Sequence, residues 1–131
     1  MREAEPEDVR VVRAFSDSWE TMDLDRIMAF LHPDVVWENV PTGEVKGAEA
    51  VRERLGAVLA QASAIRWIIV DLALSASGAV LTQRVDIVEK RKRRAELRLM
   101  GLFRLAEGRI VEWRDYFDLA GYQRQLGAGW D

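Results

Sequence analysis

Hydrophobic residues recur at helical spacing in the first part of the chain. Between Glu7 and Glu20 they lie three or four positions apart, which predicts an amphipathic helix, and acidic residues occupy its first turn, where the helix dipole favours them. Asp23 can cap a second, short helix that Pro33 should end. The same spacing predicts a third helix at about 48–60.

A period of two, typical of β-strands, governs most of the remaining chain. A first strand is expected at Val35–Val40, between the second and third helices and before a turn that contains Pro41. The later strands are joined by short turns, so consecutive strands should pair antiparallel. Four long strands are predicted at 64–74, 79–89, 95–105 and 109–117, and a closing helix at 118–126.

Helices followed by a run of strands predict an α+β domain, in which helices cover one face of a curved sheet. The chain has 131 residues and shows no internal repeat or linker, so we expect one domain spanning residues 1–131. Leu81, Val85 and Ile87 would lie on the sheet face opposite the core. A second copy of the chain would cover this outer face, which predicts a homodimer; cover by the carboxy-terminal tail is the alternative.

Composition excludes several kinds of chemistry. The absence of cysteine excludes disulfides, thiolate metal sites and a cysteine nucleophile, and the single His32 excludes a multi-histidine metal site within one chain. A net charge of -3 argues against nucleic-acid binding, and the five cations at 90–94 are typical of a solvated turn between strands. Residues 65–74, the longest apolar stretch, are too short to span a membrane, and the first eight residues lack the apolar core of a signal peptide. We therefore expect a cytoplasmic protein.

Charged residues in the middle of two apolar strands are the candidate chemistry. Alternation puts Arg84 and Asp86 on one face of their strand and places Asp115 in an otherwise apolar row of the last strand. Trp37 and Asn39 share a face of the first strand. These faces are either solvent-exposed or together line an apolar concavity. Burial would be costly for a purely structural set, whereas two carboxylates on one arginine have pKa values pushed apart, which suits acid and base catalysis.

The chain resembles the limonene-1,2-epoxide hydrolase family in this region. The resemblance rests on Arg84-Val85-Asp86 and on the segment Trp-Arg-Asp-Tyr-Phe-Asp at 113–118, with support from Trp-Glu-Asn at 37–39. It implies a nuclear-transport-factor-2-like cone, a fold shared with ketosteroid isomerases and SnoaL-type polyketide cyclases. The sheet would be strongly curved, mixed but mostly antiparallel, with about three amino-terminal helices on its concave face.

The resemblance also implies roles for the charged residues. Asp115 would take a proton from the water that attacks one epoxide carbon, Asp86 would donate a proton to the opening oxygen, and Arg84 would bridge the two carboxylates. Asn39 would help to position the water. No metal or cofactor is required. The implied activity is hydrolysis of an apolar epoxide, terpene-like or cyclic, to a vicinal diol.

One site residue departs from the family pattern. Trp37 stands where the family has a tyrosine whose hydroxyl also contacts the attacking water. An indole N–H only donates hydrogen bonds, and its ring is larger, so the water must be held differently. The consequence could be slower hydrolysis, attack on the other epoxide carbon, or use of a substrate hydroxyl in place of water.

Apolar residues around these positions are the candidate substrate wall, although each is equally compatible with the core. They are Met28, Leu31, Leu74, Met100 and Phe117. Trp19, Trp67 and Trp113 are expected to be packing residues and not ligand contacts. Two further functions remain open for this chain. One is an epoxide-opening cyclase or an isomerase or polyketide-cyclase-like enzyme of the same fold, and the other is a non-catalytic carrier of small apolar ligands. A carrier would tolerate neutral replacements of both aspartates.

Overall fold

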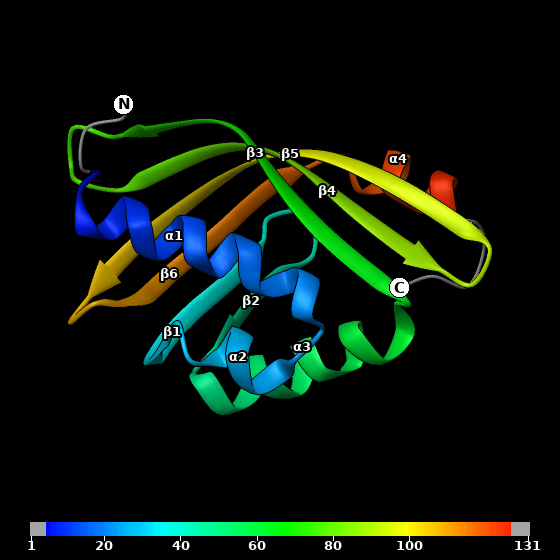
Figure 1. Ribbon diagram of the computed structural model, residues 1–131, viewed down its shortest axis with the longest axis horizontal. Helices are drawn as coiled ribbons and strands as arrows, with labels where there is room; N and C mark the ends of the chain where they lie inside the picture. Colours follow the sequence, from blue (N-terminus) through cyan, green and yellow to red (C-terminus); the bar gives the residue numbers. More distant parts are fainter. Residues whose placement is uncertain (1–4, 127–131) are drawn as a thin grey trace.

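The structure is a computed structural model, and it describes residues 5–126 (Figure 1). Its helices are α1 (Glu7–Ser18), α2 (Leu24–Met28), α3 (Ala48–Gln61) and α4 (Leu119–Leu126), with a 3-10 turn at Trp19–Thr21. Its strands are β1 (Leu31–Asn39), β2 (Gly43–Lys46), β3 (Ala64–Leu74), β4 (Val80–Lys90), β5 (Arg93–Ala106) and β6 (Arg109–Phe117).

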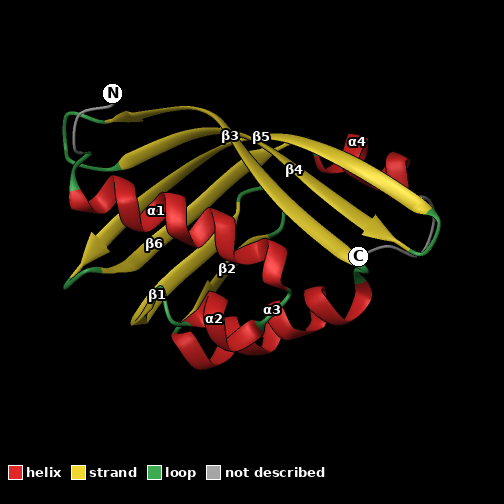
Figure 2. Ribbon diagram, viewed as in Figure 1, coloured by secondary structure: helices red, strands yellow, loops and turns green. Residues whose placement is uncertain are grey.

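The strands form one strongly curved sheet in the order β2-β1-β6-β5-β4-β3. All neighbouring strands are antiparallel except β1 and β6, which run parallel. The sheet curls around α1, α2 and α3 without closing, so the helices fill its concave side (Figures 1 and 2). The predicted fold class, a mixed but mostly antiparallel sheet with helices on its concave face, is confirmed.

Local details differ from the sequence-based expectation where long-range pairing decides them. Pro33 does not end the second helix, which stops at Met28 with its amino terminus capped by Asp23 as predicted. Instead Pro33 lies inside β1, where the pairing with β6 shifts register between Leu31 and Val36. A strand tolerates proline at such an irregularity because no ladder hydrogen bond is lost there. The short edge strand β2 was not predicted.

An aromatic cluster joins the helices to the sheet. Phe15 of α1 is fully buried, with ring centroids 5.4 Å from Trp67 on β3 and 5.2 Å from Trp113 on β6. Trp19 stacks on Trp67 at 4.6 Å. These side chains are held by contacts on several elements, so they form a rigid wall beside the polar residues of the sheet.

The tip of the β4–β5 hairpin and the outer face of β4 match the expected pattern. Residues 90–94 form the tip of the β4–β5 hairpin. Leu81, Val85 and Ile87 are half-buried on the outer face, where Met100 and Tyr116 are exposed. Across the described part of the chain, no helix has the length and apolarity that a bilayer crossing requires.

Candidate active site

Two carboxylates share one guanidinium on the concave face of the sheet. The Nε and Nη2 atoms of Arg84 donate to Oδ1 and Oδ2 of Asp86, each at 3.0 Å. Its Nη1 and Nη2 atoms donate to Oδ1 and Oδ2 of Asp115 at 3.1 and 3.0 Å. Asp115 also accepts a hydrogen bond from Nε1 of Trp113 at 3.0 Å. Arg84 therefore bridges the two acids, and Asp115 accepts one more hydrogen bond than Asp86 does.

Strand alternation and register create this arrangement. Arg84 and Asp86 are two residues apart on β4 and so point to the same face. Gly101 of β5 lies between Thr82 of β4 and Asp115 of β6 in the pairing of the three strands. Because Gly101 has no side chain, Arg84 can cross β5 to reach Asp115. A Cβ atom at Gly101 would lie 2.7 Å from Nη1 of Arg84 and 2.8 Å from Oδ1 of Asp115.

Burial makes the charges of this group interdependent. Arg84, Asp86 and Asp115 are 1%, 6% and 5% exposed. With both acids ionised the group would carry one net negative charge, which is costly in a low-dielectric interior. Burial raises the pKa of the Asp86 carboxyl to about 6, against the opposing effect of Arg84. Burial also lowers the pKa of Arg84, but the two carboxylates outweigh it and raise that pKa above its usual value.

Aromatic rings enclose the charged group. The Cζ atom of Arg84 lies 3.9 Å from the ring centroid of Trp67, a cation–π contact that shields the guanidinium from water. Trp37 of β1 stacks on Trp113 of β6 at 4.7 Å, because the parallel pairing sets these residues opposite each other. The same pairing sets Asn39 opposite Asp115. The site is thus polar at one point and apolar around it.

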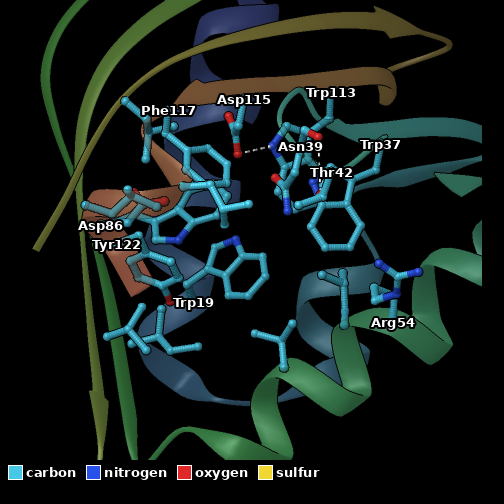
Figure 3. Close-up of a pocket in the computed structure, with 18 of the residues that line it drawn as sticks. Trp19, Trp37, Asn39, Thr42, Arg54, Asp86, Trp113, Asp115, Phe117 and Tyr122 are labelled. Atoms are coloured by element: carbon cyan, nitrogen blue, oxygen red, sulfur yellow. Dashed lines mark hydrogen bonds between the residues drawn. The ribbon is translucent and has the colours of Figure 1, made fainter. Parts of the chain in front are cut away.

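The charged group borders a cavity of about 400 Å³, large enough for a small organic molecule (Figure 3). Asp86 and Asp115 line the cavity, whereas Arg84 does not. Within residues 5–126 no group of three or more histidine, aspartate or glutamate side chains is arranged to hold a metal ion. The walls come from the helices and from the concave face of the sheet: Trp19, Trp37, Asn39, Thr42, Arg54, Leu55, Val58, Ile65, Trp67, Val88, Leu97, Leu99, Trp113, Phe117, Leu119, Tyr122 and Gln123.

The five residues assigned to chemistry come together, but most of the predicted substrate wall does not. Phe117 lines the cavity, whereas Met28, Leu31, Leu74 and Met100 do not. Leu74 and Met100 are 48% and 53% exposed. Leu31 is buried at the far end of β1 from Asn39, and Met28 packs against the core. An apolar residue has the same appearance in sequence whether it faces a core, a cavity or solvent.

Tryptophans that were predicted to be packing residues form much of the cavity wall. Trp19, Trp67 and Trp113 were expected to be packing residues, and they both pack and line the cavity. Gly101 and Arg54 were not anticipated. A glycine inside a strand is a signal of close approach and could have indicated Gly101. No local signal distinguishes Arg54 from the other arginines of its helix.

A family model described as a SnoaL-like domain matches residues 12–113, which is most of the chain. The chain belongs to the SnoaL-like family. Epoxide hydrolase EphG of Mycobacterium tuberculosis is 34% identical to this SnoaL-like chain over 113 residues, covering 82% of the chain and 71% of EphG. The resemblance to epoxide hydrolases of the limonene type, expected from the motifs, is therefore confirmed.

Solved structures give the same result for this SnoaL-like protein. An LEH-like epoxide hydrolase of M. tuberculosis superposes with a TM-score of 0.79 at 31% identity, covering 92% of both chains. A putative isomerase from Bacillus subtilis reaches a TM-score of 0.83 at 15% identity and covers 95% of both chains. At 15% identity, the second likeness concerns the fold alone.

Replacing Gly101 with alanine should disrupt the charged group. The added methyl would force Arg84 or Asp115 to move, and neither can do so freely in a packed interior. We expect Gly101→Ala to lower the free energy of unfolding by about 1–3 kcal/mol, as overpacking commonly does. Thermal and urea denaturation would measure this change.

Gly56→Ala is the matched control for that experiment. Gly56 lies within α3, and a Cβ there would be 3.5 Å from Leu24, an ordinary contact. Alanine is favoured over glycine inside a helix by about 1 kcal/mol, so this variant should gain stability. Equal stability changes of the same sign in both variants would contradict the close approach at Gly101.

Proposed function

We propose that the protein hydrolyses an apolar epoxide to a vicinal diol by one-step acid and base catalysis. The observation that supports this most directly is the sharing of Arg84 by two buried carboxylates at the border of an apolar cavity. Resemblance to epoxide hydrolases at 34% and 31% identity supports the same reaction. A strained three-membered ring needs only a positioned nucleophile and an acid for the leaving oxygen.

In the proposed reaction, Asp115 is the base and Asp86 is the acid. The oxygen of a water attacks one epoxide carbon as the carbon–oxygen bond breaks. The water gives a proton to Asp115, and Asp86 gives its proton to the epoxide oxygen, so the product is a neutral diol. The site ends with the proton on Asp115 in place of Asp86. Proton exchange between these two carboxyl groups resets the site.

The different surroundings of the two acids support this assignment. Asp115 accepts three hydrogen bonds, two from Arg84 and one from Trp113, and these donors stabilise its negative charge. Asp86 accepts two, and burial raises its pKa to about 6. The raised pKa of Asp86 thus lets it hold the proton that it must donate.

Neutral replacement of either aspartate should abolish turnover and leave the fold intact. General acid or base catalysis contributes about 10²–10⁴-fold, so Asp86→Asn and Asp115→Asn should each lose at least about 100-fold in kcat. Each variant keeps a neutral pair of one arginine and one acid, so its Tm at pH 7 should equal or exceed that of the unchanged protein. Diol formation by chiral chromatography and thermal denaturation would measure these effects.

The pH profile supplies a second readout for the same residues. Asp86 must be protonated to act, so kcat/KM should fall about tenfold per pH unit above its pKa of about 6. The same raised pKa means that stability from this group is lost as the pH rises through about 6, a dependence that Asp86→Asn should remove. A collapse of Tm in both variants would indicate structural residues, and full activity would show that the two aspartates are not the catalytic acid and base. Binding of apolar ligands without turnover, in the unchanged protein and in both variants, would indicate a ligand carrier.

Trp37 bears on which nucleophile the site uses. Its Nε1 atom is buried and has no acceptor among residues 5–126. Because an indole N–H can only donate, it cannot accept a hydrogen bond from the water as a hydroxyl can. A site that holds water less well would suit an epoxide-opening cyclase, in which a hydroxyl of the substrate attacks. Hydrolysis and cyclisation therefore share one machinery and differ in their product.

Trp37→Tyr should raise the rate of hydrolysis, by about threefold or more if the hydroxyl restores one hydrogen bond to the water. Tyrosine keeps a ring that can stack on Trp113. Trp37→Phe is the matched control, because it keeps the ring without the hydroxyl. An unchanged or lower rate for Trp37→Tyr, relative to Trp37→Phe, would mean that the water is held in another way or that the reaction is not hydrolysis.

We further propose that the outer sheet face pairs two copies of the chain. Met100 and Tyr116 lie opposite each other on β5 and β6 and are 53% and 51% exposed, beside the half-buried outer residues of β4. Light scattering should give the mass of a dimer, and Met100→Glu should convert it to a monomer by placing a charge in the interface. Leu74→Glu should remain dimeric, because Leu74 pairs with Val80 of β4 and so lies on the opposite face of the sheet. A monomeric parent protein would contradict the proposal.

A further inference from the structure

Helix α3 carries two arginines with different surroundings. Arg52 is paired with Asp25 of α2 in an ion pair that joins the two helices. Arg54 lines the cavity together with Leu55 and Val58, its neighbours on the inward face of the helix. Arg54 is therefore a cation on the wall of a cavity whose other helical residues are apolar.

No acid neutralises Arg54 within residues 5–126, where no ion pair or hydrogen bond of its guanidinium occurs. Helix positions three and four residues away, where a partner would lie, hold only alanine and valine: Ala50, Val51, Ala57 and Val58. An arginine that is not needed for an ion pair and borders a ligand-sized cavity is available to bind a ligand.

Two indoles of the same cavity also lack partners. Trp19 and Trp37 are 3% and 6% exposed, and neither Nε1 atom has an acceptor among residues 5–126. A buried donor without an acceptor costs about 1–3 kcal/mol. Together with Arg54, these groups are donors of the cavity wall without an acceptor in the described part of the chain. A ligand that brings acceptor oxygens in addition to apolar surface would satisfy them.

We propose that the substrate is an amphipathic epoxide whose carboxylate binds Arg54 while its epoxide ring lies against Asp86 and Asp115. This rests on the proposed hydrolysis and names the substrate class for the same site. Arg54 and Asp86 lie on opposite sides of the cavity in Figure 3, so the carboxylate is kept apart from the acids. One guanidinium balances one negative charge and matches a planar carboxylate in a two-point contact, whereas a phosphate would leave charge unbalanced.

The matched probes are terminal epoxy-carboxylates of increasing chain length and their methyl esters. The unchanged protein should favour the acid over its ester in kcat/KM, by about three- to tenfold at the preferred length, since the ion pair is partly exposed. The preference should shrink as the salt concentration rises. Arg54→Gln should remove it by raising KM for the acid relative to KM for the ester.

Arg109→Gln is the control, because it removes the same charge from an exposed position at the start of β6, away from the cavity. It should keep the preference for the acid. Equal use of acid and ester by the unchanged protein, or a preference that survives Arg54→Gln, would overturn the inference.

Binding separates this inference from the proposed reaction. If neither epoxide is turned over, calorimetry with the saturated carboxylic acid of the same length decides. Binding that weakens in Arg54→Gln but not in Arg109→Gln would support the carboxylate site while the hydrolase proposal fails. Binding that is indifferent to Arg54, or no binding at all, would overturn the carboxylate site.

Discussion

One buried guanidinium shared by two buried carboxylates is the constraint on which this site depends. Arg84 is 1% exposed and supplies one positive charge to two potential negative charges. Because an unbalanced charge is costly away from water, the group favours a proton on one acid, and burial raises the pKa of Asp86 to about 6. In the proposed mechanism, the cost of burying the group thus also places an acid and a base side by side.

The neighbouring structure keeps this group in one arrangement. Gly101 leaves room for Arg84 to cross a strand, Trp113 gives Asp115 its third donor, and Trp67 covers the guanidinium. These side chains belong to β3, β5 and β6, so the curvature of the whole sheet determines the geometry of the site.

The same aromatic residues serve as core and as cavity wall. Trp19 and Trp113 pack against Phe15 under α1 and also line the cavity. The shape of the cavity is therefore set by residues that the core also requires, while Arg54 on α3 is exposed and lies outside the core cluster. The cavity thus combines a rigid apolar wall with a polar position at one side.

Much of the site followed from the sequence because a strand has a period of two. That period alone places Arg84 and Asp86 on one face and Asp115 in an apolar row, and the motifs around them indicated the family. The same period does not indicate which face of the sheet is concave. It also does not indicate that β1 pairs in parallel with β6, which brings Asn39 beside Asp115. Such pairing joins residues far apart in the chain and leaves no local signal.

The tertiary structure alone decided the substrate wall. Leu74 and Met100 are apolar residues of strands, as cavity residues would be, yet they are about half exposed, while the tryptophans interpreted as packing line the cavity. Side-chain chemistry and spacing determined which residues could act together. Which of them share a dry cavity was decided by the curvature of the sheet and the helices packed inside it, because burial is a property of the whole fold.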